Sequence, residues 1–352
     1  MAGCAGEMAH WWPDFLLDVP MRAISDSAML VDSFGRRIDA LRVSVTDRCD
    51  LRCTYCLPKG FKGFEAPAQW LTHAEMARLV GLFVALGVRK VRLTGGEPLL
   101  RRGLTGLAAQ IAAMPGVSDL SLSSNGTQLA QHAAGLKAAG VQRLNISLDT
   151  LDAPCFAQIT GRDALAEVLD GVMAAKRAGF DPIKLNMVVQ GGVNDAEVAR
   201  MLAFALEHRF ILRLIETMPM GDTGPRVAPV DVSVLGLRLA HQFGLIPAVV
   251  AAKNGPARYW SLPGHGVCLG VITPLSQHFC DTCNRVRLDA TGTLHLCLGQ
   301  ADQAPLGALL RAGATDEALK SAIIAAIAQK PARHDFNTQA TKIIRFMSQT
   351  GG

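Results

Sequence analysis

The sequence has few charges, no long basic run and no long apolar run, and each shortage argues against a class of protein. Charged residues make up only 18% of the 352 residues, without a long stretch of Lys or Arg, which argues against a nucleic-acid-binding protein. No apolar run reaches the ~20 residues that a membrane-spanning helix needs. A Walker A pattern is also missing, which excludes a P-loop GTPase. We therefore expect no nucleic-acid partner and no membrane partner.

Apolar residues, in contrast, are abundant at 49%, so the chain can bury a sizeable core in one large or two ordinary domains. The formal net charge of +5 is modest and suits a small anionic substrate. Six of the nine cysteines fall into two clusters, and no secretory signal precedes them. Clustered free thiols are typical of a reducing compartment, so we expect a cytoplasmic protein.

The N-terminal stretch carries neither a secretory nor a transit signal. Arg22 is the only Arg or Lys among the first 25 residues, and Glu7, Asp14 and Asp18 argue against a basic transit peptide. We expect residues 1–29 to be an N-terminal extension that is dispensable.

The first cysteine cluster consists of Cys49, Cys53 and Cys56, in the spacing C-x3-C-x2-C directly after the strand-like run 41–46. Thiolates are the ligands that iron–sulfur clusters and zinc prefer. A closed zinc site needs four ligands, and no His lies nearby. A four-iron cluster on three cysteines would leave one iron open for chemistry. Spacing alone leaves both the cluster and part of a zinc site open.

The second cysteine cluster consists of Cys280, Cys283 and Cys297. Cys268 could complete a zinc site here, but it lies in the apolar strand-like run 267–272, where a buried structural cysteine is expected. Cys4 and Cys155 are interpreted as non-ligands.

Between and after these clusters, strand and helix signals alternate. Short apolar runs rich in β-branched residues predict strands at 41–46, 90–93, 119–123, 144–148, 184–189 and 211–216. Helices are predicted from the capping box of Thr72 and Glu75, from Asn194, and over 127–139, 163–178 and 315–330. Repeated strand–helix units predict an α/β fold with a parallel sheet, open or barrel-like.

Polar and basic residues recur at the strand ends. Gly95 and Gly96 in the segment 92–98 would let backbone approach a ligand and leave N–H groups free. Six basic residues are spaced to converge on one cavity if a barrel forms: Arg42, Arg92, Lys184, Arg213, Arg285 and Arg287. Because buried guanidinium groups need partners and bind phosphate oxygens well, these residues indicate a phosphorylated ligand.

The run from Arg42 to Pro58, RVSVTDRCDLRCTYCLP, resembles the radical S-adenosylmethionine (SAM) superfamily and, within it, the GTP 3′,8-cyclase family of molybdenum cofactor biosynthesis. The resemblance covers roughly residues 30–352. It implies a partial (β/α)6 TIM-like barrel, the radical SAM core, at 30–220. It also implies a C-terminal region at 221–352 that carries a second iron–sulfur cluster, binds GTP and ends in a Gly-Gly tail.

The implied activity is that of a lyase. A 5′-deoxyadenosyl radical from SAM would convert GTP to (8S)-3′,8-cyclo-7,8-dihydroguanosine 5′-triphosphate, the first step of molybdopterin biosynthesis. Implied cofactors are SAM and two 4Fe-4S clusters, one on each cysteine trio, the first binding SAM and the second the substrate.

The resemblance also assigns roles residue by residue. The implied SAM contacts are Tyr55, Gly96, Ser147 and Met218. The implied GTP contacts are Arg42, Arg92, Ser123, Lys184, Arg285, Val286 and Arg287, to which the convergence of basic residues adds Arg213. We expect catalytic roles for Arg42, Arg285, Arg287, Gly351 and Gly352. The residues before the terminal glycines, 345–349, depart from the family's usual aromatic ending, so the docking of the tail is not fixed by the resemblance.

Expected partners are GTP, an electron donor such as a flavodoxin or ferredoxin, and the downstream cyclic pyranopterin monophosphate synthase, and the resemblance leaves a homodimer open. Three alternatives remain: a peptide-modifying radical SAM enzyme with auxiliary clusters, a non-catalytic iron–sulfur electron carrier, and a zinc-stabilised binding module.

Overall fold

Six short apolar strands, each followed by at least one helix, form the centre of the fold. The computed structural model describes residues 29–58, 60–64, 66–220, 228–248, 255–336 and 345–351. The strands lie parallel and side by side in chain order. They are β1 (Ala40–Ser44), β2 (Lys90–Thr94), β3 (Asp119–Ser124), β4 (Arg143–Ser147), β5 (Ile183–Val188) and β6 (Ile211–Ile215). Each lies within two residues of its predicted range, so the strand predictions are confirmed.

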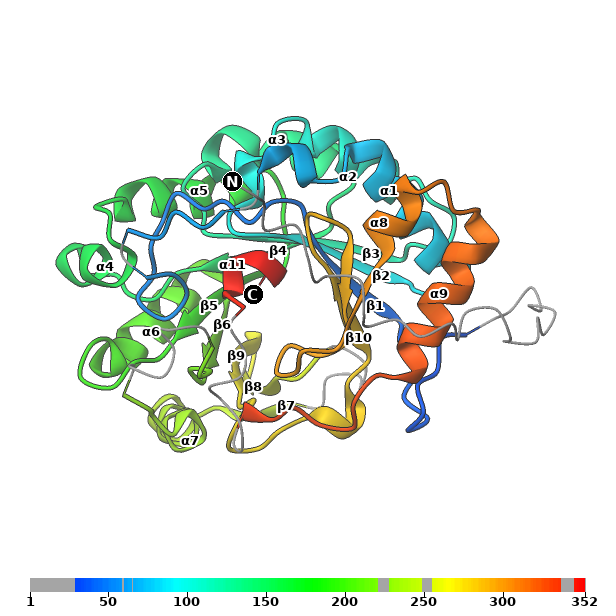
Figure 1. Cartoon of the computed structure of the whole chain (residues 1–352). Helices are drawn as coiled ribbons and strands as arrows, with labels where there is room; N and C mark the ends of the chain where they lie inside the picture. Colours follow the sequence, from blue (N-terminus) through cyan, green and yellow to red (C-terminus); the bar gives the residue numbers. More distant parts are fainter. Residues whose placement is uncertain are drawn as a thin grey trace, which may run out of the picture.

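The helices that follow these strands cover the outer face of the curved sheet (Figure 1). They are α1 (His73–Ala85), α2 (Leu104–Ala112), α3 (Leu129–Ala138), α4 (Ala153–Thr160), α5 (Leu165–Arg177) and α6 (Val198–His208), with short 3-10 turns η1 (Pro67–Gln69), η2 (Pro98–Leu100) and η3 (Asp195–Glu197). The capping box of Thr72 and Glu75 is present at α1. Asn194 caps no helix, because its side chain instead bonds the backbone of Asp149, Val188 and Gln190, and α6 begins only after η3.

The C-terminal part extends the same sheet at both edges. Its elements are α7 (Val232–Phe243), β7 (Ile246–Ala248), β8 (Arg258–Leu262), β9 (Gly266–Ile272), η5 (Cys280–Thr282), β10 (Arg285–Leu288), β11 (Thr293–His295), β12 (Gln303–Pro305), α8 (Leu306–Arg311), α9 (Asp316–Ala328) and α11 (Met347–Thr350). Strand β9 pairs in parallel with β6, and β10 pairs in parallel with β1. The described strands thereby form one 12-stranded sheet in the order β12-β11-β10-β1-β2-β3-β4-β5-β6-β9-β8-β7.

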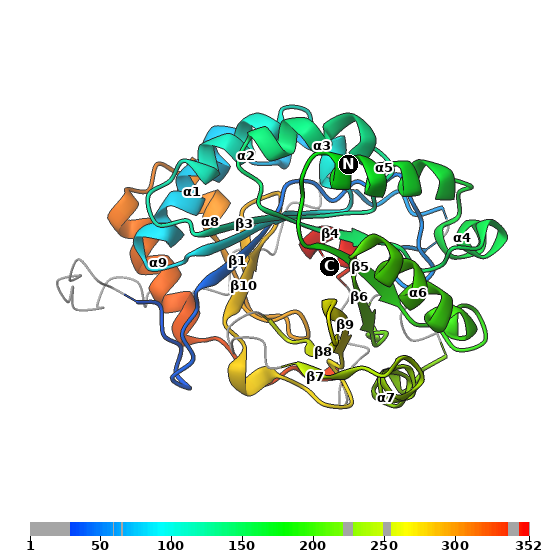
Figure 2. The same cartoon turned by 180° about the vertical axis from the view of Figure 1, so that it is seen from behind.

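The two faces of the sheet differ in chemistry because side chains alternate along a strand. On β1, Leu41 and Val43 are buried in the core beneath the helices, whereas Arg42, between them, points to the inner face. This inner face is concave, and Figures 1 and 2 both show the short helix α11 and the C-terminus inside the curve. No helix in the described ranges is long and apolar enough to cross a membrane.

Candidate active site

One cavity of about 360 Å³ lies on the concave face of the sheet, and both cysteine trios line it. Cys49, Cys53 and Cys56 come from the loop after β1, and all three thiols are free and half-buried. Burial raises the pKa of Cys49 and of Cys56 to about 12 and that of Cys53 well above its ordinary value. Such thiols lose their protons only when a cation offsets the charge, which is what a bound metal does.

The second trio faces the same cavity from the C-terminal part. Cys280 begins η5, Cys283 directly follows it, and Cys297 follows β11. Although burial acts to raise it, the pKa of Cys283 is lowered because the positive charges of Lys330 and Arg285 favour its thiolate. The protein therefore favours the thiolate at Cys283, whereas burial raises the pKa of Cys297.

Within the described ranges, no three Cys, His, Asp or Glu side chains converge on one point as the ligands of a single metal ion would. This arrangement is compatible with an iron–sulfur cluster, in which each thiolate binds a different iron. The donor sets fit two such clusters: each trio offers free sulfur ligands at the wall of a cavity, with one coordination position left for another ligand.

Basic side chains form a layer across the concave face. Arg42 on β1 lies in register with Arg92 on β2 and Arg287 on β10. Burial lowers the pKa of Arg42, and repulsion from Arg287 and Arg92 lowers it further. Arg42 makes no hydrogen bond or ion pair with any other described residue. An anion in the cavity would relieve this concentration of buried positive charge.

Most, but not all, of the six predicted basic residues meet at the cavity. Arg42, Arg92, Arg213, Arg285 and Arg287 line it. Lys184 is not among the lining residues; its Nζ lies 5.8 Å from the ring centre of Tyr259, and burial lowers its pKa to about 7. Val286 and Ser123 also line the cavity, and the buried Ser123 Oγ has no hydrogen-bond partner among the described residues. The predicted GTP contacts other than Lys184 thus share one space.

The four predicted SAM contacts line the same cavity: Tyr55, Gly96, Ser147 and Met218. The Tyr55 hydroxyl donates to Asp149 Oδ2 at 2.7 Å, which fixes the ring beside the cysteines. Burial raises the pKa of Asp149 to about 6, although this hydrogen bond acts in the opposite direction.

The glycine segment after β2 serves a purpose that differs from the predicted one. The expectation that its glycines leave N–H groups free is wrong at Gly96, whose N–H donates to Thr46 O at 2.8 Å. A Cβ on Gly95 would overlap Thr46 O, and one on Gly96 would overlap Arg48 O. The glycines therefore let β2's end pack directly against the backbone that leads into the cysteine loop. That packing still leaves both glycines at the cavity wall.

The C-terminal tail enters the cavity. Arg287 Nη1 donates to the carbonyl oxygens of Thr350, at 3.1 Å, and Gly351. Gly351 has a φ of +73°, and its Cα packs so closely on Thr94 that an added Cβ would overlap that side chain. At the other end of α11, the Phe346 ring lies 4.6 Å from that of Phe61, centre to centre. The departure from an aromatic ending has therefore not prevented docking. Gly352 lies outside the described residues.

Three contributors to the site were not predicted from the sequence. Arg143 also lines the cavity. It precedes the predicted strand 144–148 by one residue, so it was not counted among the basic residues of the strands. Tyr259 packs against Gly270, and its buried hydroxyl has no hydrogen-bond partner among the described residues. No sequence pattern indicates Thr94, because its role is to contact Gly351, which lies more than 250 positions away in the chain.

Comparisons with known proteins identify the family of this chain. Residues 43–205 match the family model of the radical SAM superfamily, and residues 210–336 match the model described as Molybdenum Cofactor Synthesis C. A protein of Pseudomonas aeruginosa named GTP 3′,8-cyclase 2 is 44% identical over 334 residues, which cover 94% of this chain and all of that protein. A GTP 3′,8-cyclase of Pseudomonas fluorescens is 46% identical over 330 residues, 92% of this chain and 99% of the relative.

Among solved structures, the crystal structure of Streptococcus suis SuiB bound to S-adenosylmethionine superposes with a TM-score of 0.56. It covers 81% of this chain and 67% of that chain, at 13% sequence identity. At this identity the likeness concerns the fold alone, and it agrees with a partial barrel of the radical SAM type.

Proposed function

This chain belongs to the GTP 3′,8-cyclase family of the radical SAM superfamily, and from that premise we propose which residues perform each part of the reaction. The protein is a radical SAM lyase that cyclises GTP in molybdenum cofactor biosynthesis. An iron–sulfur cluster and SAM are its cofactors. The observation that carries the proposal is that two cysteine trios and a layer of arginines line one cavity.

We propose that Cys49, Cys53 and Cys56 hold a first 4Fe-4S cluster and that the second trio holds another. When bound, these clusters and SAM supply the one-electron chemistry that the side chains of the chain cannot supply. The trios lie at the wall of the same cavity, so SAM at the first and GTP at the second would face one another. Holding two reactants in this way removes much of the entropic barrier between them.

The SAM contacts proposed for this chain are Tyr55, Gly96, Ser147 and Met218. All four line the cavity that the first trio also lines, which supports the assignment, and the bond from Tyr55 to Asp149 keeps that ring in place before any ligand arrives. Gly95 and Gly96 pack closely on the backbone that leads into the cysteine loop. This packing fixes the distance between Gly96, a proposed SAM contact, and the first trio.

The arginines are proposed to bind the triphosphate and to orient the nucleotide. Arg42, Arg92, Arg213 and Arg285 present guanidinium groups to the cavity, joined by Ser123 and by the backbone of Val286, whose side chain packs in the core. Lys184 lies behind this layer, beside Tyr259, where burial and the nearby arginines lower its pKa to about 7, so it carries only part of a positive charge near neutral pH. Guanidinium groups suit phosphate oxygens because they bind two at once and are always charged.

Arg287 is proposed to act on the nucleotide and on the tail together. The Arg287→Ala variant should keep its iron and its SAM cleavage but form little cyclised product. Charge-assisted hydrogen bonds contribute roughly 1.5–3 kcal/mol each, so their loss weakens GTP binding by about one to two orders of magnitude. Iron content and 5′-deoxyadenosine should be measured beside GTP affinity and product.

The matched control for this prediction is Arg78→Ala, because Arg78 pairs with Asp316 on the surface and is 42% exposed. It should leave all four quantities unchanged. If Arg287→Ala loses iron together with product, Arg287 supports the second trio structurally and the substrate assignment fails.

The remaining partners and the location are proposed on the family resemblance. They are an electron donor such as a flavodoxin or ferredoxin, the downstream cyclic pyranopterin monophosphate synthase, a second copy of the chain, and a cytoplasmic setting. The last is supported by the eight described cysteines, all of which are free. We also propose the division into an extension at 1–29, a radical SAM core at 30–220 and a C-terminal region at 221–352.

Deleting residues 1–25 should leave turnover largely intact, because every side chain that lines the cavity in the described ranges lies after residue 39. The measurement is product formation per chain at matched iron content, for the shortened and the full-length protein. A large drop in turnover with normal iron would contradict a dispensable extension.

A further inference from the structure

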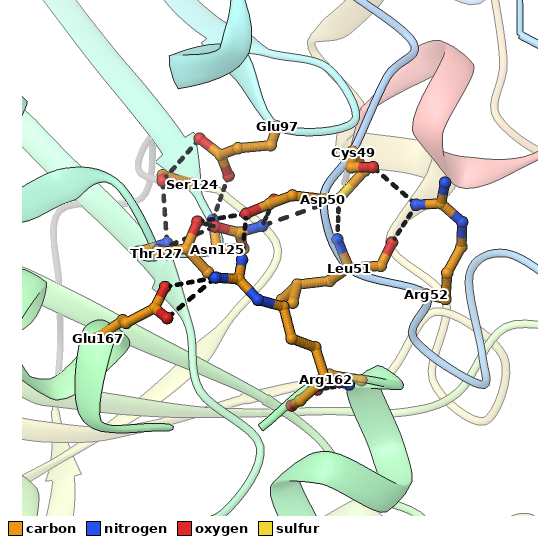
Figure 3. A network of polar contacts seen from close by, with 12 residues as sticks. Cys49, Asp50, Leu51, Arg52, Glu97, Ser124, Asn125, Thr127, Arg162 and Glu167 are labelled. Carbon is orange, nitrogen blue, oxygen red and sulfur yellow. Dashed lines mark hydrogen bonds and ion pairs between the residues drawn. The ribbon is translucent and has the colours of Figure 1, made fainter. Parts of the chain in front are cut away.

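Asn125 stands where β3 ends, directly behind the cysteine loop (Figure 3). Its side-chain nitrogen Nδ2 lies 3.8 Å from Cys49 Sγ and 2.7 Å from Asp50 Oδ1. The first distance is long but within reach of a hydrogen bond to sulfur. The two amide hydrogens therefore point at the sulfur of a proposed cluster ligand and at the carboxylate beside it. None of the roles assigned above includes this residue.

The orientation of the Asn125 amide is fixed by its other contacts. Its Oδ1 accepts the backbone N–H of Thr127 at 3.0 Å, so Nδ2 must be the atom that faces Cys49. Its own backbone N–H donates to Glu97 Oε2 at 2.6 Å. Glu97 is fully buried and also accepts from Ser124 Oγ at 2.9 Å. The amide is held from both sides before a cluster is present.

The same network partly offsets the negative charge of Asp50. Asp50 Oδ2 lies 2.8 Å from Thr127 Oγ1 and 3.1 Å from Arg162 Nη1. Arg162 in turn binds both carboxylate oxygens of Glu167 on α5 at 2.9 Å. Figure 3 shows these side chains as one connected group that reaches from α5 to the cysteine loop. Asp50 is thus partly compensated at its Oδ2.

We propose that Asn125 is a positioning residue of the first cluster, whose amide donates to the Cys49 sulfur and screens it from Asp50, and so sets how readily the cluster is reduced. The inference rests on the proposed ligand role of Cys49. Reduction adds negative charge to a cluster and its thiolates. A donor to the sulfur stabilises the reduced form more than the oxidised form, so it raises the reduction potential.

The test is a redox titration of the reconstituted holoenzyme, following the electron paramagnetic resonance signal that changes when SAM is added. At the potential where half of the wild-type first cluster is reduced, Asn125→Ala should show an about tenfold lower ratio of reduced to oxidised cluster. For a one-electron couple this is a midpoint about 59 mV lower. An unchanged midpoint with full iron would overturn the proposal.

Thr127→Val is the matched control, since it removes a hydroxyl from the same network without touching a sulfur. The ratio of reduced to oxidised cluster should change less than about threefold. This corresponds to a midpoint shift of less than about half of 59 mV. An equal shift in Thr127→Val and Asn125→Ala would assign the effect to a loosened network and contradict a role of the amide itself.

A second variant covers the case in which Asn125→Ala assembles no cluster. Asn125→Asp keeps the side-chain shape and the acceptor for Thr127 but replaces the donor by a negative charge, so its midpoint should lie at least as low. If both variants lose iron while Thr127→Val keeps it, Asn125 is needed for assembly and the claim about reduction fails. If the wild-type protein itself holds no cluster at the first trio, the ligand assignment fails instead.

Discussion

Cys53→Ala should abolish SAM cleavage, whereas Cys283→Ala should retain uncoupled SAM cleavage and lose the cyclised product. Cys53 belongs to the trio beside the proposed SAM contacts, and Cys283 to the trio beside Arg285 and Arg287. Removing one cysteine from either trio leaves the other trio and the residues around it in place. The readouts are 5′-deoxyadenosine and cyclised product, each per iron bound.

Cys155→Ala is the control for these two variants, because Cys155 is also free and half-buried but is not among the cavity-lining residues. It should retain iron, SAM cleavage and product. An equal loss of SAM cleavage in Cys53→Ala and Cys283→Ala would contradict the proposed division of labour between the trios.

Gly351→Ala should strongly reduce cyclised product while leaving iron content unchanged. The backbone at Gly351 has φ +73° and ψ 149°, a conformation that is strained for any residue with a Cβ, by roughly 1–3 kcal/mol. That strain alone weakens docking of the tail by about tenfold. The overlap of the new Cβ with Thr94 weakens it further. The tail should then leave Arg287, and limited proteolysis should cleave it faster than in the wild type.

Gly313→Ala separates backbone strain from the close approach. Gly313 has a φ of +85°, and an added Cβ there meets nothing within 4 Å. This variant should lose some stability, seen as a lower melting temperature, and keep its turnover per folded chain. If Gly351→Ala keeps wild-type turnover, the docked tail has no part in cyclisation.

Much of the central barrel could be predicted from the sequence because its strands are local features. The strand 183–188 alternates the buried apolar residues Ile183, Leu185 and Met187 with Lys184 and Asn186, and an alternation of this kind is recognised without knowing the neighbouring strands. The capping box at Thr72 is likewise a contact between residues three positions apart. The spacing of each cysteine trio is also local, and it carried the functional assignment.

Features that the sequence could not reveal depend on pairing over long distances. The parallel register of Ala40 with Arg285 joins segments far apart in the chain, and no local pattern predicts it. The contacts of Arg287 and Thr94 with Gly351 are of the same kind. The free N–H expected at Gly96 was wrong for this reason: it donates to Thr46 O, and a backbone oxygen of Arg48 excludes a side chain there.

The position of the tail changes how the basic layer is understood. Arg287 was predicted to bind the nucleotide, and in the structure its guanidinium already holds two tail carbonyls. Arg42, its neighbour in register, has no partner among the described residues. The two arginines therefore present one satisfied and one unsatisfied cation side by side. If GTP binds at this layer as proposed, its binding and the docking of the tail would share one wall of the cavity.

The most direct test of the two-cluster site is metal analysis of the anaerobically reconstituted protein. We expect about eight irons and a similar amount of sulfide per chain, four for each trio, with only traces of zinc. Removing Cys280, Cys283 and Cys297 together should halve the iron. Stoichiometric zinc in place of iron at the second trio, or iron that stays unchanged when this trio is removed, would contradict the two-cluster site.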